Sequence, residues 1–163
     1  MLSLHGHFRY LRYSPSGLIL ARGIAINGIT TPAINDLFET QFRSGTQKPS
    51  WYLGLIRDDN YTALAAADTM ASHAGWEEGT EYSEGTRPAW SAGAAAGKAI
   101  ANSAAAEFTV NAEQTFKGLF LASNSTKGGT TGILWCTGLF DVEQSMPSGQ
   151  VLKVYYTLDG REG

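Results

Sequence analysis

Three histidines are the first side chains in this sequence whose type could support chemistry. His5 and His7 stand two positions apart, so a strand would place both imidazoles on one face, whereas His73 lies far away along the chain. With a carboxylate from Asp68 or Glu77, they could form a site of two histidines and one carboxylate around a metal ion. Exposed histidines near a terminus and a loop histidine with a local hydrogen bond are the commoner interpretation. We therefore predict that no metal is bound.

Carboxylates are the second group that could do chemistry. Asp58 and Asp59 could offer oxygen ligands to Ca²⁺, but the alternate acids, central glycine and distal glutamate of an EF-hand loop are missing. We expect a turn that ends the preceding strand. Four glutamates within eight residues could supply the acid pair of a glycoside hydrolase, although such a density is more typical of a solvated surface. They are Glu77, Glu78, Glu81 and Glu84.

No nucleophile stands in a catalytic pattern. The sequence has neither a Gly-x-Ser-x-Gly elbow nor a phosphate-binding loop, and Lys127-Gly128-Gly129 is expected to be a turn. Cys136 follows Trp135 in an apolar stretch, where a small buried thiol is the ordinary interpretation. As the single cysteine, it excludes an internal disulfide and a four-cysteine zinc site. We therefore predict that the protein is not an enzyme, has no catalytic residue and needs no cofactor.

Aromatic residues in the acidic middle of the chain raise a further possibility. Trp76 and Trp90 could form a platform for a sugar, but such tryptophans more often anchor a long loop, because an ordered loop must bury apolar area to offset its lost entropy. Tyr82 adds to this apolar content. Arg87 follows the acids directly and is the natural partner of one of them in a bidentate ion pair. Residues 68–90 are therefore predicted to be a long ordered loop with an architectural role.

Length and composition favour one folded domain. The 163 residues are 43% hydrophobic and 17% charged, which excludes disorder driven by charge. The net charge of −3 argues against a general nucleic-acid binder. No apolar run is long enough for a membrane span, and the first residues do not resemble a secretory leader. We expect a single β-rich domain over residues 1–163, with no direct contact to nucleic acid or membrane.

Charge is unevenly distributed along the chain. Residues 1–57 hold six basic and two acidic residues, residues 58–84 hold seven acids and no lysine or arginine, and residues 85–163 hold six of each. One interpretation is a single solvated acidic loop region. The other is electrostatic pairing between copies, with the acidic segment of one subunit facing a basic edge of another.

Apolar patterning predicts an antiparallel β-sandwich or jelly-roll-like fold with one short helix. The helix is expected over 32–42, because Thr31-Pro32 is a typical helix start and apolar residues follow at helical spacing. Residues 93–106 could be a flexible loop or a strand of small residues. The expected strands are His7–Tyr13, Leu18–Ile26, Trp51–Ile56, Glu107–Asn111, Phe116–Ala122, Ile133–Phe140 and Val151–Leu158. The expected shared core contains Trp51, Leu53, Leu55, Phe108, Phe120, Leu134, Val154 and Tyr156.

Several blocks of this sequence resemble a family of short virion proteins of tailed bacteriophages. The most specific blocks are Asp68–Glu78 and Arg87–Trp90, and Trp51–Ile56, Gly118–Leu121 and the strand after Gly149 also match. The resemblance runs from about residue 7 to the C-terminus. It implies a structural protein of the particle, assembled in the cytoplasm of the host bacterium, and it assigns no catalytic residue.

The role we expect within the particle is capsid decoration or cementing. The partners would be the phage major capsid protein, other virion proteins and further copies in a homo-oligomer, and residues 1–7 could form an N-terminal arm. The alternative is a tail or head-fibre binding module that contacts host-surface glycan, which exposed aromatic residues on one surface would favour. The candidate interface residues are Asp68, His73, Trp76, Glu77, Tyr82, Arg87 and Trp90.

Overall fold

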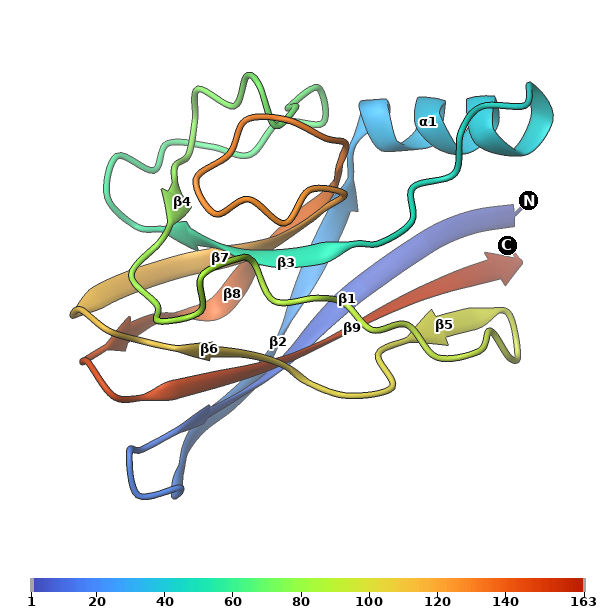
Figure 1. Cartoon of the computed structure of the whole chain (residues 1–163). Helices are drawn as coiled ribbons and strands as arrows, with labels where there is room; N and C mark the ends of the chain where they lie inside the picture. The colour runs from blue at the N-terminus through green and yellow to red at the C-terminus, as the bar shows by residue number, and fades with distance from the viewer. Residues whose placement is uncertain (1, 163) are drawn as a thin grey trace.

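The computed structural model describes residues 2–162 and is mainly antiparallel β, as the sequence predicts (Figure 1). This part of the chain contains nine strands and one helix. The strands are β1 (Leu2–Tyr13), β2 (Ile19–Ile29), β3 (Tyr52–Arg57), β4 (Glu78–Gly79), β5 (Ala99–Ala101), β6 (Ala106–Thr109), β7 (Gln114–Ala122), β8 (Leu134–Met146) and β9 (Val151–Glu162), and the helix is α1 (Thr31–Phe42).

The strands form two layers that share β2. One layer, the β1 layer, contains β2, β1 and β9, with β5 and β6 both paired to β9. The other, the β7 layer, runs from the end of β2 through β8, β7 and β3 to β4. Ile26 is the last β2 residue whose partner is in β1, and Asn27–Ile29 pair with β8. The long strand β2 therefore passes from one layer of a β-sandwich-like fold into the other.

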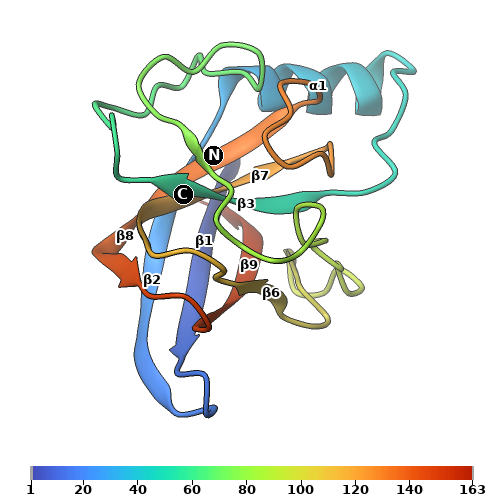
Figure 2. The ribbon, with the colours of Figure 1, turned by 60° about the vertical axis from the view of Figure 1, so that its left-hand side comes forward.

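A tight turn joins β1 to β2, between the first two strands that the sequence predicts. Gly17 has a φ of +86°, which only glycine adopts readily, and the Ser14 N–H donates to the Leu18 carbonyl at 2.8 Å. Both views show the hairpin extending beyond the rest of the molecule (Figures 1 and 2).

The N-terminal segment is a strand and not an arm in this structure. From Leu2 onward it pairs with β9 in an unbroken register that begins opposite Glu162 and ends at Val151. Each rung satisfies backbone groups that a free arm would leave to water. The first strand therefore begins at Leu2, earlier than the predicted start at His7. Met1 lies outside the described residues.

The helix begins one residue before its predicted start, and its capping explains why. The Thr30 hydroxyl accepts a hydrogen bond from the Ala33 N–H at 3.2 Å and donates to the Leu134 carbonyl. Pro32 occupies the first turn, where its missing N–H costs nothing. The Thr31 N–H donates to the Ala66 carbonyl at 2.7 Å. These bonds tie the start of α1 to β8 and to the loop after β3.

Two separate apolar clusters replace the single core that the sequence suggests. Because side chains alternate along a strand, Leu119 and Leu121 of β7 point between the layers, whereas Phe120 points outward into a second cluster. Gly54 of β3 lies directly under the Phe120 ring, where any side chain would overlap it. Leu53, Leu55, Phe108, Val154 and Tyr156 belong to the inner cluster, Phe120 and Leu134 belong to the outer one, and Trp51 is only partly buried.

Candidate functional site

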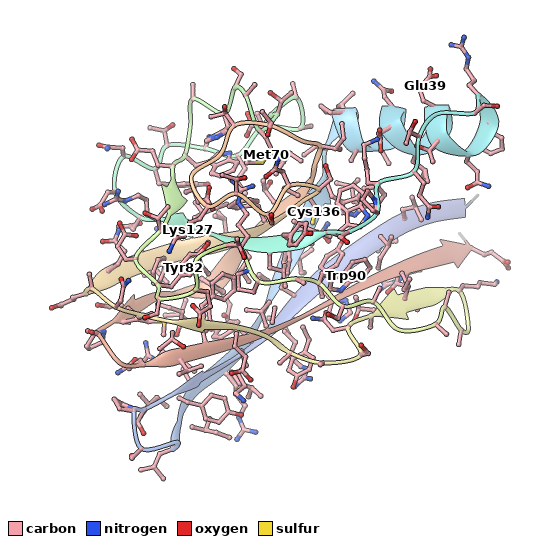
Figure 3. The ribbon with its side chains drawn as sticks, in the orientation of Figure 1. Glu39, Met70, Tyr82, Trp90, Lys127 and Cys136 are labelled. Carbon is pink, nitrogen blue, oxygen red and sulfur yellow. The ribbon has the colours of Figure 1, made fainter. Side chains whose placement is uncertain are left out.

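The outer cluster is covered by the loop that follows β3. Trp76 in this loop is 2% exposed, and its ring centroid lies 5.3 Å from that of Phe120. Its indole N–H donates to Asp68 Oδ2 at 2.9 Å. The His73 ring stacks on the indole, with 3.9 Å between the ring centroids. Met70 completes the cover (Figure 3). Asp68, His73 and Trp76 thus hold the loop onto the sheet.

A buried ion pair joins this loop to its neighbours and confirms the prediction that Arg87 pairs with one of the preceding acids. Its guanidinium makes two hydrogen bonds to the Glu78 carboxylate, at 2.8 and 2.7 Å, and neither side chain is more than 7% exposed. Arg87 also donates to the carbonyls of Asn124 and Gly129, both at 2.8 Å, and lies over the Phe120 ring. One side chain therefore connects β4, the segment at residue 87 and the loop between β7 and β8.

Tyr82 lies inside the molecule beside Lys127 (Figure 3). Its ring meets Phe108 edge-on, and the Lys127 ammonium lies 4.3 Å from the ring centroid and donates to the Tyr82 carbonyl. Burial, with the Glu78 charge nearby, raises the pKa of the Tyr82 hydroxyl well above its ordinary value. Tyr82 thus takes part in packing and is not presented to a partner.

The predicted interface residues differ widely in exposure. Asp68, Trp76, Tyr82 and Arg87 are buried, His73 and Trp90 are half-buried, and Glu77 is exposed. Because Trp76 and Tyr82 have no free surface, the exposed aromatic surface that would favour a glycan-binding module does not form from these residues.

The histidines do not come together. His5 and His7 lie on β1, in the opposite layer from the loop that carries His73. Within residues 2–162, no three histidine, cysteine, aspartate or glutamate side chains are grouped as a metal site would require. Asp59 forms an ion pair with Arg57 at 2.8 Å and accepts a hydrogen bond from Gln114, and these contacts lower the pKa of its carboxyl group. The Asp58–Asn60 segment is thus a turn held by side chains of this chain.

The glutamates and the cysteine have structural partners. Glu78 pairs with Arg87, Glu84 accepts from the Thr109 N–H, and Glu81 accepts from the Thr80 N–H. Cys136 is fully buried, and burial raises the pKa of its thiol to about 12. At neutral pH this thiol is therefore protonated and shielded from reagents.

The outer face of the β1 layer carries a different set of side chains. Three successive rungs cross β2, β1 and β9 on this face: Ile26–His7–Thr157, Ile24–Arg9–Tyr155 and Arg22–Leu11–Lys153. Arg9 lies 4.1 Å from the Tyr155 ring centroid, and Lys153 pairs with Glu107. Among the ion pairs of residues 2–162, none involves Arg9 or Arg22. This face therefore mixes apolar side chains with basic ones, of which Arg9 and Arg22 have no ion-pair partner among residues 2–162.

The edge of β2 next to this face is unpaired over most of its length. Residues 19–26, which we call the β2 edge, bond to β1 on one side, whereas β8 joins the other side only at residues 27–29. Beyond that point β2 and β8 diverge around a groove of about 570 Å³ whose apolar lining includes Ile24, Ile26, Leu64 and Leu139. Ile24 is 51% exposed and Ile26 is 76% exposed. The β2 edge thus presents free backbone groups next to free apolar side chains.

Exposed apolar side chains continue from the β2 edge to α1. Phe38 and Phe42 are 54% and 77% exposed and pack on each other. With Ile26, Ile29 and Leu4 they line a groove of about 630 Å³. Helical spacing alone does not show which apolar side chains of a helix face water, so the exposure of both phenylalanines was missed from the sequence. The five large apolar residues within the predicted strand Leu18–Ile26 were the signal available for the β2 edge.

A comparison with models of known protein families finds no match, and neither does a search of curated proteins. Residues 2–162 contain no helix with the length and apolar character needed to cross a bilayer.

Proposed function

We propose that this protein is a structural component of a tailed bacteriophage particle, where it decorates or cements the capsid by binding the major shell protein and its own copies. The β2 edge is the observation that carries the proposal. A free strand edge with apolar neighbours is a ready template for pairing with another chain, and strand addition is a recurring mode of protein association. The sequence resemblance over Asp68–Glu78 and Arg87–Trp90 supports the virion context.

The apolar side chains beside the β2 edge support contact with protein. Leu18, Ile19 and Leu20 at the tip of the hairpin are 67%, 56% and 44% exposed, and they precede the exposed Ile24 and Ile26 along the chain. Exposed apolar residues gathered in one region mark interaction sites in folded proteins. Covering it with a neighbouring subunit would remove that area from water, which is the main driving force of association.

Charge supports a defined register between copies. Acids outnumber bases around the end of β3, where Arg57 and Lys117 are shared among several carboxylates, whereas Arg9 and Arg22 on the β1 layer lack such partners. Complementary surfaces of this kind set orientation more than affinity. The carboxylates concerned are Asp58, Asp59, Glu77, Glu81 and Glu143.

The number of copies in purified particles tests the proposal. Quantitative mass spectrometry should find this chain at hundreds of copies, whereas three, six or twelve copies would place it in the tail and none would exclude it from the particle. The double variant Ile24→Lys and Ile26→Lys should lose incorporation, because two charges would be buried at the β2 edge. The double variant Ala71→Lys and Ala74→Lys adds the same two charges at exposed positions of the loop over the other layer, and it should be incorporated normally.

A further inference from the structure

A pocket of about 500 Å³ lies between α1, the residues just before β3, β5 and the C-terminal half of β9. Its volume is in the range of small-ligand sites, which are mostly apolar with a few placed polar groups. Three tryptophans from separate segments line it: Trp51 before β3, Trp90 from the loop before β5, and Trp135 from β8. Trp90 is seen below α1 and near β9 in Figure 3. This pocket lies away from the β2 edge. The sequence raised Trp90 as part of a sugar platform with Trp76, whereas the structure places it with Trp51 and Trp135.

The indole rings are fixed by the protein. The Trp90 N–H donates to the Tyr156 carbonyl at 3.1 Å, and the Trp135 N–H donates to the Tyr156 hydroxyl at 3.2 Å. Trp51 meets Trp135 edge-on, with 5.5 Å between ring centroids. Because both N–H donors are already satisfied, Trp90 and Trp135 offer the pocket only apolar ring surface. Pre-set aromatic walls lower the entropy cost of binding a ligand.

The helix side of the pocket is polar. Asp36 and Lys48 form an ion pair at 2.6 Å, and their side chains are 17% and 28% exposed. Thr40, Gln41 and Gln47 stand beside them. Carboxylate, ammonium, hydroxyl and amide groups thus face one side of the space, and indole rings face the other.

We infer that this pocket binds a saccharide unit. A sugar ring has an apolar face of C–H groups and an edge of hydroxyls that both donate and accept hydrogen bonds, so it matches an indole wall opposite a mixed polar wall. A purely apolar ligand would partly desolvate the Asp36–Lys48 ion pair and offer it no hydrogen bond in return. An anionic ligand would find the Lys48 charge already compensated by Asp36. The inference is independent of the role proposed for the β2 edge.

Tryptophan fluorescence and saturation-transfer NMR on the purified chain test the inference. The probes are methyl glycosides of glucose, galactose, mannose, rhamnose and N-acetylglucosamine, with indole and adenosine as aromatic comparisons. At least one glycoside should bind saturably, with a dissociation constant on the order of millimolar. Absence of saturable binding by every glycoside, or binding of indole or adenosine in their place, would overturn it.

Variants locate the binding. Trp90→Ala should weaken the glycoside by tenfold or more, about the factor that 1.4 kcal/mol represents. Because Trp90 also contacts Tyr156, the rim variant Gln47→Ala, at an exposed position, provides a second test that leaves the packing intact. It should weaken binding with no change in melting temperature. Phe42→Ala, an exposed aromatic outside the pocket, is the matched control and should bind as the unaltered chain does; equal binding by all three variants would contradict the assignment.

Discussion

The two outer faces of this β-sandwich-like fold differ in whether the chain covers its own apolar side chains. Over the β7 layer, the chain covers Phe120 with its own Trp76 and holds the cover with the buried Arg87–Glu78 pair. Over the β1 layer, Ile24 and Ile26 remain exposed beside an unpaired strand edge. Apolar surface that a chain could cover but leaves open is available to a partner. The comparison therefore separates the part of the sequence that stabilises the fold from the part available for assembly.

Among changes that compare the two faces, removal of the Arg87 side chain should change the free energy of unfolding most. Arg87→Ala leaves Glu78 buried without its partner, and breaking a buried pair in this way lowers the free energy of unfolding by about 3–5 kcal/mol. Urea denaturation measures it. Arg22→Ala, on the exposed face, should change stability by no more than about 0.5 kcal/mol. Similar losses for both variants would remove the distinction between the two faces.

Truncating an aromatic residue on each face gives the next comparison. Trp76→Ala should lower the free energy of unfolding by about 3–5 kcal/mol, since it removes a buried ring from the Phe120 cluster. Phe42→Ala should leave it within about 0.5 kcal/mol, because most of that side chain is already in water. A loss below about 1 kcal/mol for Trp76→Ala would show that the loop does not depend on this ring.

The buried thiol reports on the same stabilisation. With its pKa raised to about 12 by burial, Cys136 should resist alkylation at pH 7 and react only when the chain opens. Arg87→Ala should speed alkylation, because it raises the population of the opened chain, and Ile24→Lys should not. Rapid labelling of the unaltered protein would mean that the thiol is not enclosed.

The smallest expected change in stability is at Asp59, an exposed residue just after β3. Hydrogen bonds from Gln114 and Arg57 lower the pKa of the Asp59 carboxyl group in the folded protein. The ionised carboxylate therefore stabilises the fold at pH values above its pKa in the unfolded chain. This stabilisation is lost as the pH falls through the pKa of the folded protein. Asp59→Asn should slightly lower the melting temperature at pH 7, and the difference should vanish in acid. A difference that grew as the pH fell would contradict the ion pair.

Local signals predicted the elements well. Thr31-Pro32 located the helix start to within one residue, and Trp51–Ile56 nearly coincides with β3. The partner of Arg87 was predicted only as one of several acids, because its identity depends on how the loop folds back.

What the sequence did not predict depends on contacts between distant segments. Leu119, Phe120 and Leu121 are all apolar, so their pattern cannot show that Phe120 belongs to a second cluster. That assignment requires the loop carrying Trp76 to cover the outer side of β7. The exposure of Phe38 and Phe42 and the pocket of three tryptophans likewise arise only when α1 is placed against the sheets.

Hydrogen exchange at the β2 edge tests the central claim most directly. In the isolated protein, those amides of residues 19–26 that do not bond to β1 should exchange rapidly, while amides of β7 are protected in a fully paired strand. In purified phage particles, the same β2 amides should become strongly protected, because a shell subunit or a second copy covers them. Exchange that stays equally fast in particles would contradict the account.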